Sequence, residues 1–277
     1  MTPPAVTGLL TLARDTALAA GELAVRRRAE GVEVAATKSS PEDIVTTTDR
    51  ETEALIRRLL AEARPNDGFF GEESEASVGT SGLTWVVDPI DGTVNFLYGI
   101  PGYAVSIAVV EGDPDPATWT TLAGAVVNPA LGEVYTATAG GGSRLGEREL
   151  RVNTGVPLSL ALVSTGFGYD AALRVRQAEV VRGLIGRVRD IRRMGSAALD
   201  LCAVAAGRLD LYYERGLNPW DHAAGALIAR EAGARIGGFG GEREGIDLLI
   251  AGAPDLYDTV EPLLAELFAE FMAVDGR

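Results

Sequence analysis

Apolar side chains recur near helical spacing at both ends of the chain. Residues 6 to 29 show this spacing and finish in three consecutive arginines, which favours a long amphipathic helix. Residues 254 to 272 show it again, with Pro262 as a kink or a second helix start. The apolar positions are Leu9, Leu10, Leu12, Ala13, Ala17, Leu18 and Ala20 in the first helix, and Leu256, Val260, Leu263, Leu264, Leu267 and Phe268 in the last.

The first half of the chain continues with one more helix and then with strand patterns. Thr48 or Asp49 could cap that helix, because apolar residues follow at helical spacing. Residues 84–87 and 103–110 are apolar and rich in β-branched side chains, which predicts strands. Residues 121–137 form two apolar runs around an Asn-Pro turn, which predicts a β-hairpin. We therefore expect an α+β arrangement with largely antiparallel strands.

Strands and helices alternate after about residue 150, which predicts an α/β half with helices packed on a sheet. No repeat, low-complexity tract or flexible linker separates the halves. We therefore expect two intimate subdomains, residues 1–150 and 151–277. The predicted strands of the second half are 160–164, 190–194, 209–213, 234–236 and 248–251, and its helices are 171–187, 195–206, 221–232 and 254–272.

Composition and charge limit the classes of function. The chain has 277 residues, 47% of them hydrophobic, which suffices for a large core. Its formal net charge of -14 argues against general nucleic-acid binding and against binding to an anionic membrane surface. We see no signal peptide, and the longest uncharged run is interrupted at residues 99–102, so no membrane helix is predicted. A cytoplasmic protein is expected.

The single cysteine and the single histidine exclude other kinds of site. One cysteine allows no intramolecular disulfide, and Cys202 lies in an apolar helix pattern that is typical of a buried, inert thiol. His222 would have to build a Ser-His-Asp triad or a histidine zinc site alone, so we interpret it as a bystander. In an enzyme of this composition, metal and carboxylate must activate water.

Residues 85–96, Trp-Val-Val-Asp-Pro-Ile-Asp-Gly-Thr-Val-Asn-Phe, carry the main chemical signal. A buried strand is predicted to break at Asp88-Pro89, and Asp91 follows after a spacing of three. Paired acids at a strand end suit a hard cation such as Mg²⁺. Gly92 allows the backbone to approach a ligand closely, and the N–H groups of the next turn can face an anion. Alone, the stretch could equally be a loop in which both acids only cap turns.

Further acids each have a structural and a functional interpretation. Glu72 and Glu73 end a short strand that begins with two aromatics. Asp49 could be only a helix cap. Asp221 could be only an acid at the positive end of a helix, although the small residues after it would allow the turn to approach a metal centre. Lys38 alone is a solvated surface base.

Together these segments resemble the inositol monophosphatase family, and within it the bacterial inositol-1-monophosphatase subgroup. The segments that carry the resemblance appear in order at plausible spacing. That family has the sugar-phosphatase fold, so the resemblance implies a layered α-β-α-β-α sandwich. The matching segments are residues 38–49, 70–74, 85–96, 195–198, 220–225 and 231–233.

The resemblance implies a role for each matching residue. It implies two or three Mg²⁺ ions, inhibition by lithium and a homodimer. Glu73 follows the motif as a structural residue, and Lys38 lies near the metal site. The implied metal ligands are Glu72, Asp88, Asp91 and Asp221, with the backbone carbonyl of Ile90. The implied catalytic residues are Glu72 and Thr93, with Asp49 behind Thr93. The implied substrate-binding residues are Asp91, Gly92, Thr93, Gly195, Ser196, Ala197 and Glu214.

Three hypotheses about function remain open at this stage. The first is Mg²⁺-dependent hydrolysis of myo-inositol monophosphate, a small phosphorylated polyol, with Glu214 binding the polyol. The second is a sibling phosphatase for histidinol phosphate, fructose 1,6-bisphosphate or 3′-phosphoadenosine 5′-phosphate. The third is a non-enzymatic partner of transcription machinery, for which the arginines between residues 182 and 193 give a basic stretch in an acidic chain. The bland interpretation of that stretch is a solvated helix face or a dimer rim.

Overall fold

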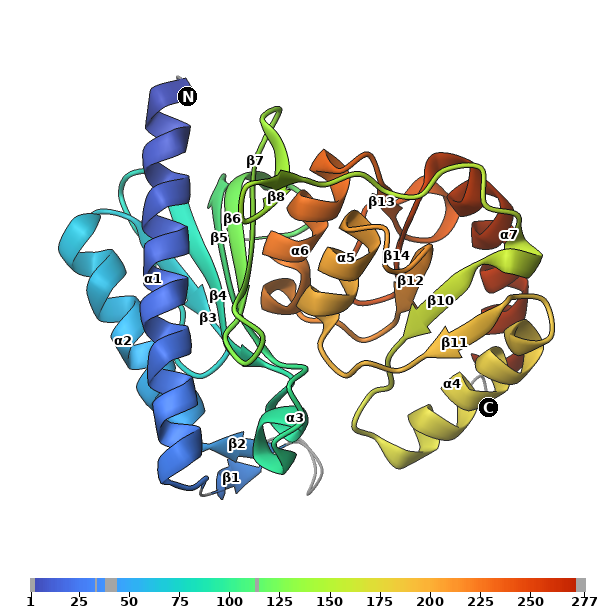
Figure 1. Ribbon diagram of the computed structural model, residues 1–277, viewed down its shortest axis with the longest axis horizontal. Coiled ribbons are helices and arrows are strands. Elements are labelled where there is room, and N and C mark those ends of the chain that lie inside the picture. The colour runs from blue at the N-terminus through green and yellow to red at the C-terminus, as the bar shows by residue number, and fades with distance from the viewer. Residues whose placement is uncertain (1–2, 33, 38–43, 113–114, 273–277) are drawn as a thin grey trace.

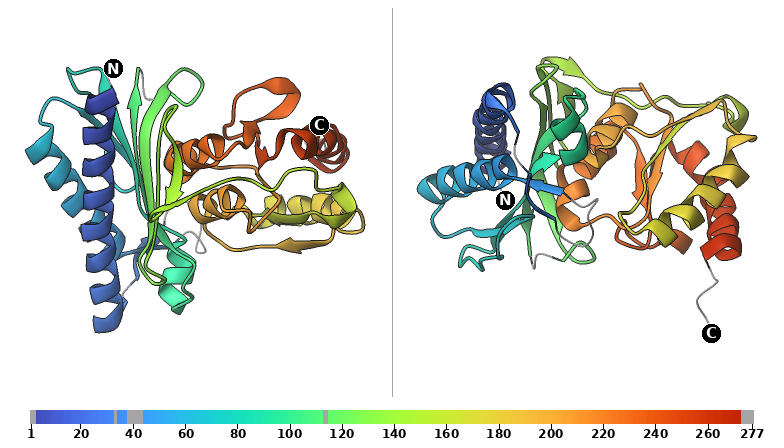
Figure 2. Two further views of the ribbon diagram at one scale, coloured as in Figure 1. Left: turned by 45° about the horizontal axis from the view of Figure 1, so that its top comes forward. Right: turned by 90° about the horizontal axis from the view of Figure 1, so that it is seen from below.

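The protein is layered, with helices on both outer faces and a helix pair between two sheets (Figures 1 and 2). The computed structural model describes residues 3–32, 34–37, 44–112 and 115–272. Helices α1 (Pro3–Glu30) and α2 (Thr47–Ala63) cover one face of a seven-stranded sheet. Helices α5 (Ala197–Ala205) and α6 (Pro219–Glu231) lie between the two sheets. Helices α4 (Ala171–Ile185) and α7 (Pro254–Met272) cover the five-stranded sheet, which confirms the predicted α-β-α-β-α order.

The seven-stranded sheet has the order β3-β4-β5-β6-β7-β8-β9. Strand β3 pairs with β4 in parallel, and the other neighbours are antiparallel. The predicted hairpin is present as β6 and β7, which pair from Ala123–Thr138 to Asn128–Glu133. The strands are β3 (Gly68–Gly71), β4 (Leu83–Asp91), β5 (Ala104–Glu111), β6 (Thr120–Asn128), β7 (Glu133–Thr138), β8 (Gly142–Leu145) and β9 (Arg148–Glu149).

The five-stranded sheet has the order β11-β10-β12-β14-β13. Strand β10 runs parallel to both β11 and β12, whereas β14 pairs antiparallel with β12 and β13. The carboxyl ends of β10, β11 and β12 therefore meet at one sheet edge. The strands are β10 (Leu162–Thr165), β11 (Asp190–Arg192), β12 (Leu211–Glu214), β13 (Arg235–Gly237) and β14 (Leu249–Gly252), with 3-10 turns at Leu158–Leu160 and Phe239–Gly241. Strands β1 (Val34–Thr37) and β2 (Ile44–Thr46) form a separate antiparallel pair.

The core has one large apolar cluster in each space between layers. The predicted inner face of α1 is buried, and Leu9, Ala13 and Ala17 pack under the seven-stranded sheet. Between the sheets, α5 and α6 bury small side chains, and Cys202 is fully buried among them as the sequence predicts. Burial raises the pKa of the Cys202 thiol well above its usual value. In the described ranges, no helix combines the length and the apolar character needed to cross a membrane.

The predicted break of the central strand at Asp88-Pro89 is wrong. Strand β4 continues to Asp91, and its register with β5 shifts between the Asp88–Ser106 and Asp91–Ala104 pairs. A bulge tolerates Pro89 because it leaves residues outside the regular ladder, where the missing N–H is not needed. The bulge re-aims the end of the strand and places both aspartates there.

Candidate active site

Strand β4 ends in two aspartates that backbone donors hold in place. The Asp88 carboxylate is buried and accepts the Ile90 N–H at 3.0 Å. Asp91 accepts the Ser196 hydroxyl at 2.6 Å and the Ala198 N–H at 2.7 Å. Because Ser196 is the N-cap of α5, Asp91 joins the end of β4 to the start of a helix from the other half of the chain. The backbone donors occupy one oxygen of each carboxylate and leave lone pairs on the other.

Gly92 follows Asp91 and turns the chain into the short helix α3 (Thr93–Tyr98). Its φ of 92° lies in the left-handed region, which a residue without a side chain adopts readily. A Cβ here would stand 2.9 Å from the Gly102 carbonyl oxygen and 3.0 Å from that of Gly195. The backbone of this turn therefore lies bare against the neighbouring loops, as the sequence interpretation of Gly92 expects.

Thr93 and Asp49 form a polar pair behind this turn. The Thr93 hydroxyl lies 3.0 Å from the Asp49 carboxylate and 3.0 Å from the Ile90 carbonyl oxygen. Asp49 is not the N-cap of α2 as the sequence suggested: Thr46 is, and Asp49 closes the capping box by accepting the Thr46 N–H at 2.9 Å. Burial raises the pKa of Asp49 to about 6. When Thr93 donates to Asp49, its oxygen lone pairs can accept a hydrogen bond from a water.

The turn after β3 brings Glu72 to the same place. Its backbone is anchored by Glu53 of α2, whose carboxylate accepts the Glu73 N–H at 2.8 Å and also the Ser74 hydroxyl. Gly71 allows this contact, since a Cβ there would overlap the Glu53 carboxylate. The Glu73 side chain is buried and faces Arg50 at 4.0 Å. Glu53 was missed in the sequence because a glutamate inside an amphipathic helix is usually solvated.

Helix α6 brings in Asp221 from the second half of the chain. The helix begins at Pro219, so the predicted start at Asp221 is wrong, and Asn218 is its N-cap. The Asn218 N–H donates to the Asp221 carboxylate at 2.7 Å, in a second capping box. The predicted close approach of small residues is present, because a Cβ on Gly225 would lie 2.9 Å from the Leu201 side chain.

One cavity of about 540 Å³ collects these groups, and we call it the acid cavity. The phosphate turn and the acids form one wall, and the loops after β10, β11 and β12 form the other. Asp49 lies behind Thr93, outside the lining, and Lys38 lies outside the described residues. The acid cavity is lined by Glu72, Asp88, Ile90, Asp91, Gly92, Thr93, Gly166, Phe167, Gly168, Tyr169, Asp170, Leu173, Arg193, Gly195, Ser196, Ala197, Glu214, Arg215, Gly216, Leu217, Asn218, Trp220 and Asp221.

The acids of this cavity disfavour each other's charge. Burial, and then the charges of Glu72 and Asp91, raise the pKa of Asp88 well above its usual range. Burial and the charges of Asp91 and Glu72 do the same to the pKa of Asp221. Burial raises the pKa of Asp91 to about 6, although the Ser196 hydroxyl and nearby N–H groups oppose the shift. A bound cation would offset this repulsion.

The donor set of the acid cavity fits a hard cation. Carboxylate and carbonyl oxygens are the ligands of Mg²⁺ in proteins, and no softer ligand lines this cavity. As the side chains stand, the described residues contain no group of three or more acids, histidines or cysteines that could hold a metal ion. Because ionised carboxylates repel one another, we expect Glu72, Asp88, Asp91 and Asp221 to draw together only around a cation.

The opposite wall depends on contacts that the sequence did not reveal. The Tyr212 hydroxyl donates to the Glu214 carboxylate at 2.6 Å, and burial raises the pKa of Glu214 to about 7. A Cβ on Gly166 would stand only 1.9 Å from a Glu214 oxygen, so the glycine backbone lies flat against this acid. Asn95 ties the two walls together by donating to the Gly102 and Met194 carbonyl oxygens at 2.7 and 2.8 Å.

The single histidine does not line the acid cavity. His222 is 1% exposed and faces a neighbouring cavity, in agreement with the bystander interpretation. Burial lowers the pKa of His222 to about 4, so its imidazole is neutral at pH 7.

Comparison with known proteins gives matches along nearly the whole chain. The profile of the inositol monophosphatase family matches residues 6–270. The inositol-1-monophosphatase of Mycobacterium bovis is 50% identical over 221 residues, which cover 76% of this chain and 74% of that protein. The Nus factor SuhB of Pasteurella multocida is 36% identical over 269 residues, 94% of this chain and 98% of that one. The crystal structure of the extragenic suppressor protein SuhB from Bartonella henselae superposes with a TM-score of 0.85 at 35% identity, covering 93% of this chain and 98% of that chain.

Proposed function

Because the chain belongs to the inositol monophosphatase family, it is a phosphatase, and we propose that it hydrolyses myo-inositol monophosphate to inositol and phosphate with Mg²⁺. The observation that carries the proposal is the acid cavity, where four carboxylates, a bare glycine turn and a buried glutamate face one space. The acids suit a cation, the turn suits a phosphate, and the glutamate suits the hydroxyls of a polyol.

The metal ligands proposed are those of the β4 wall and its neighbours. Glu72, Asp88 and Asp91, with Asp221 and the Ile90 carbonyl, would hold the ions, two or three per site by family resemblance. Bound Mg²⁺ supplies a water of lowered pKa and neutralises charge on the phosphate and on the leaving oxygen. The aspartates contribute by being oriented beforehand, because backbone N–H groups fix Asp88, Asp91 and Asp221.

The remaining polar residues of this wall would position phosphate and water. The N–H groups after Gly92 and the Thr93 hydroxyl would bind phosphate oxygens at the start of α3. Thr93 would also accept a hydrogen bond from the attacking water while donating to Asp49 at 3.0 Å. Glu72 would accept the second proton of that water. This arrangement directs the water lone pair at phosphorus without any histidine.

The opposite wall would recognise the alcohol part of the substrate. Glu214 and the Gly195–Ala197 loop face the cavity, and Glu214 is fixed by Tyr212. A fixed carboxylate that accepts hydrogen bonds from two vicinal hydroxyls favours a polyol over an apolar alcohol. Arg193 and Arg215 also line the cavity, which keeps a bisphosphate substrate as the alternative.

A panel of phosphate esters tests the proposed substrate. We expect kcat/KM to be highest for inositol 1-phosphate among this ester, histidinol phosphate, fructose 1,6-bisphosphate and 3′-phosphoadenosine 5′-phosphate. Phosphate release at saturating Mg²⁺ would be measured for each. A higher kcat/KM for one of the other three would replace inositol monophosphate with that substrate and leave the phosphatase assignment intact.

Other properties expected from the family stay predictions. Lithium should inhibit by replacing one magnesium, and the chain should form a homodimer. Phosphate release with increasing LiCl tests the first, and sedimentation equilibrium tests the second. A cytoplasmic location also stays a prediction.

A role with transcription machinery is the second candidate, because one relative is named a Nus factor. The basic stretch that motivated this idea is largely paired within the chain. Arg182 bonds Glu179 at 2.6 Å, Arg192 bonds Asp190 at 2.5 Å, and Arg189 donates to the Leu160 carbonyl oxygen at 2.8 Å. These pairs favour the bland interpretation of the stretch. Failure of the tagged protein to recover RNA polymerase or its factors would count against this role.

A further inference from the structure

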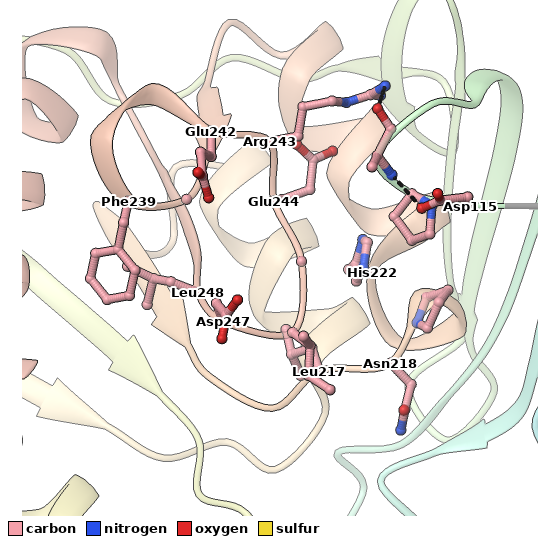
Figure 3. Close-up of a pocket in the computed structure, with 16 residues that line it drawn as sticks. Asp115, Leu217, Asn218, His222, Phe239, Glu242, Arg243, Glu244, Asp247 and Leu248 are labelled. Carbon is pink, nitrogen blue, oxygen red and sulfur yellow. Dashed lines mark hydrogen bonds between the residues drawn. The ribbon is translucent and has the colours of Figure 1, made fainter. Parts of the chain in front are cut away.

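A second cavity lies beside the acid cavity, and we call it the His222 cavity. It has a volume of about 520 Å³ and shares Leu217 and Asn218 with the acid cavity (Figure 3). It holds none of the metal-binding acids. Its lining is Asp115, Pro116, Ala117, Leu217, Asn218, Pro219, His222, Gly238, Phe239, Glu242, Arg243, Glu244, Gly245, Ile246, Asp247 and Leu248.

The buried polar group of this cavity is the imidazole of His222. The ring is 1% exposed, and neither Nδ1 nor Nε2 has a hydrogen-bond partner among the described residues. Figure 3 shows the ring among the lining side chains, with Glu244 to one side and Asn218 to the other. Leaving a buried polar group without a partner is costly, so buried imidazoles are normally paired. A neutral imidazole offers one acceptor and one donor to a ligand.

The charged groups of the His222 cavity are mostly acidic. Asp115, Glu242, Glu244 and Asp247 face one guanidinium, that of Arg243, which already donates to the Ala117 and Trp119 carbonyl oxygens.

Two of these acids have cationic partners from outside the lining. Arg230 neutralises Glu244 at 2.7 Å, and Arg215 reaches Asp247 only at 3.7 Å. In the described part of the chain, the exposed carboxylate of Glu242 has neither a hydrogen bond nor an ion pair. The mouth of the cavity therefore keeps a net negative charge.

Apolar surface completes the cavity. Leu217 and Leu248 are buried in its wall, and the half-buried Phe239 ring stands at one side. A ligand that suits this lining has a short apolar chain and a cationic nitrogen. A metal ion suits it less, since the described residues offer no group of ligands that could hold one.

We propose that the His222 cavity is a second ligand site of this phosphatase, for a small organic cation with an ammonium or guanidinium group. The cationic N–H groups donate to the unpaired imidazole nitrogen of His222 and to the carboxylate of Glu242. The methylene chain packs on Leu217, Leu248 and Phe239. The site is separate from the acid cavity and needs no metal.

Calorimetric titration of the full chain with 1,4-diaminobutane, in buffer with Mg²⁺, tests the proposal. We expect saturable binding by the diamine and none by 1,4-butanediol, a neutral molecule of similar length. His222→Phe keeps a ring and removes both nitrogens, so it should weaken binding about tenfold. Glu242→Gln should weaken it roughly two- to fivefold, as expected for an exposed charge pair.

Two further variants separate the sites. Glu214→Gln changes the acid cavity, and Asp258→Asn removes a remote exposed acid; both should bind the diamine like the wild type. Loss of binding in Glu214→Gln would place the diamine in the acid cavity and overturn the proposal. Equal binding of butanediol, no saturable heat, or unchanged affinity in both Glu242→Gln and a folded His222→Phe would overturn it as well. These outcomes do not depend on phosphatase activity.

Discussion

The two walls of the acid cavity are built in different ways. On one wall, Asp88, Asp91 and Thr93 follow each other within a single short stretch at the end of β4. On the other, Gly166 and Glu214 come after separate strands of the five-stranded sheet and meet because β10 and β12 are parallel neighbours. The first wall is local in sequence, and the second exists only through packing. We expect the first to control the chemical step and the second to control the choice of alcohol.

The largest expected effect is on the local wall. Asp91→Asn removes one charge next to the proposed metal while an amide oxygen can still accept the Ser196 and Ala198 donors. Metal-based stabilisation is worth several kcal/mol, and each 1.36 kcal/mol is tenfold in rate, so kcat/KM should fall about 10³-fold. The loss should be the same for inositol 1-phosphate and for phenyl phosphate in a phosphate-release assay.

The matched control is Asp258→Asn, which removes an exposed acid paired with Arg235 on the surface. It should leave kcat/KM within a factor of two, roughly the limit of an exposed ion pair. If Asp91→Asn kept most of the activity, or lost it for one ester only, the division of labour between the walls would be wrong.

The packed wall should respond to a methyl group. Gly166→Ala would place a Cβ 1.9 Å from the Glu214 carboxylate and force that acid out of its position. We expect kcat/KM for inositol 1-phosphate to fall about 10- to 100-fold, the value of one or two lost hydrogen bonds to a charged group. Phenyl phosphate, which has no hydroxyls to bind, should lose much less.

Gly186→Ala serves as the control for this glycine, because a Cβ there meets nothing within 4 Å. Equal losses for both esters in Gly166→Ala would mean that Glu214 does not distinguish alcohols and would dissolve the contrast between the walls.

The smallest expected effect is a pH dependence of stability. The Glu214 carboxyl has a usual pKa of 4.5, and burial raises its pKa to about 7 in the folded protein. Between these values the folded state holds a proton that the unfolded state releases, so this group's contribution to stability is lost as pH rises from about 4.5 to 7. Glu214→Gln lacks that loss.

Thermal unfolding of the metal-free wild type and of Glu214→Gln tests this linkage. The melting temperature of the wild type should fall relative to the variant between pH 5 and pH 7.5. A difference of about 2–4 °C corresponds to each 1 kcal/mol in a protein of this size class. A constant gap between the two proteins across this range would show that Glu214 titrates normally.

The same contrast explains how far the sequence alone could lead. The helices, the hairpin and the α/β half follow from periodicity, and the layered order followed from the family resemblance. The acids of the local wall stand in one motif and are easily seen. Glu53, Asn95 and Tyr212 were missed because their partners are far away in the chain or in another element.

Local rules also misplaced three features of the site. The strand through Asp88 was expected to stop at Pro89, but pairing with β5 carries it through a bulge. Asp49 and Asp221 were read as possible caps, whereas Thr46 and Asn218 hold the cap positions and the two acids close capping boxes from the third helical residue. In both helices the acid serves the cap and still reaches the site, so the structural and functional interpretations are not exclusive.

Magnesium dependence of phosphate release tests the central claim most directly. Metal-stripped protein would be assayed with inositol 1-phosphate as Mg²⁺ is added back. If the four carboxylates of the acid cavity work by holding metal, activity should be absent without Mg²⁺, rise saturably as it is added, and not be restored in Asp91→Asn at the same concentrations. Equal phosphate release with and without metal would contradict the claim.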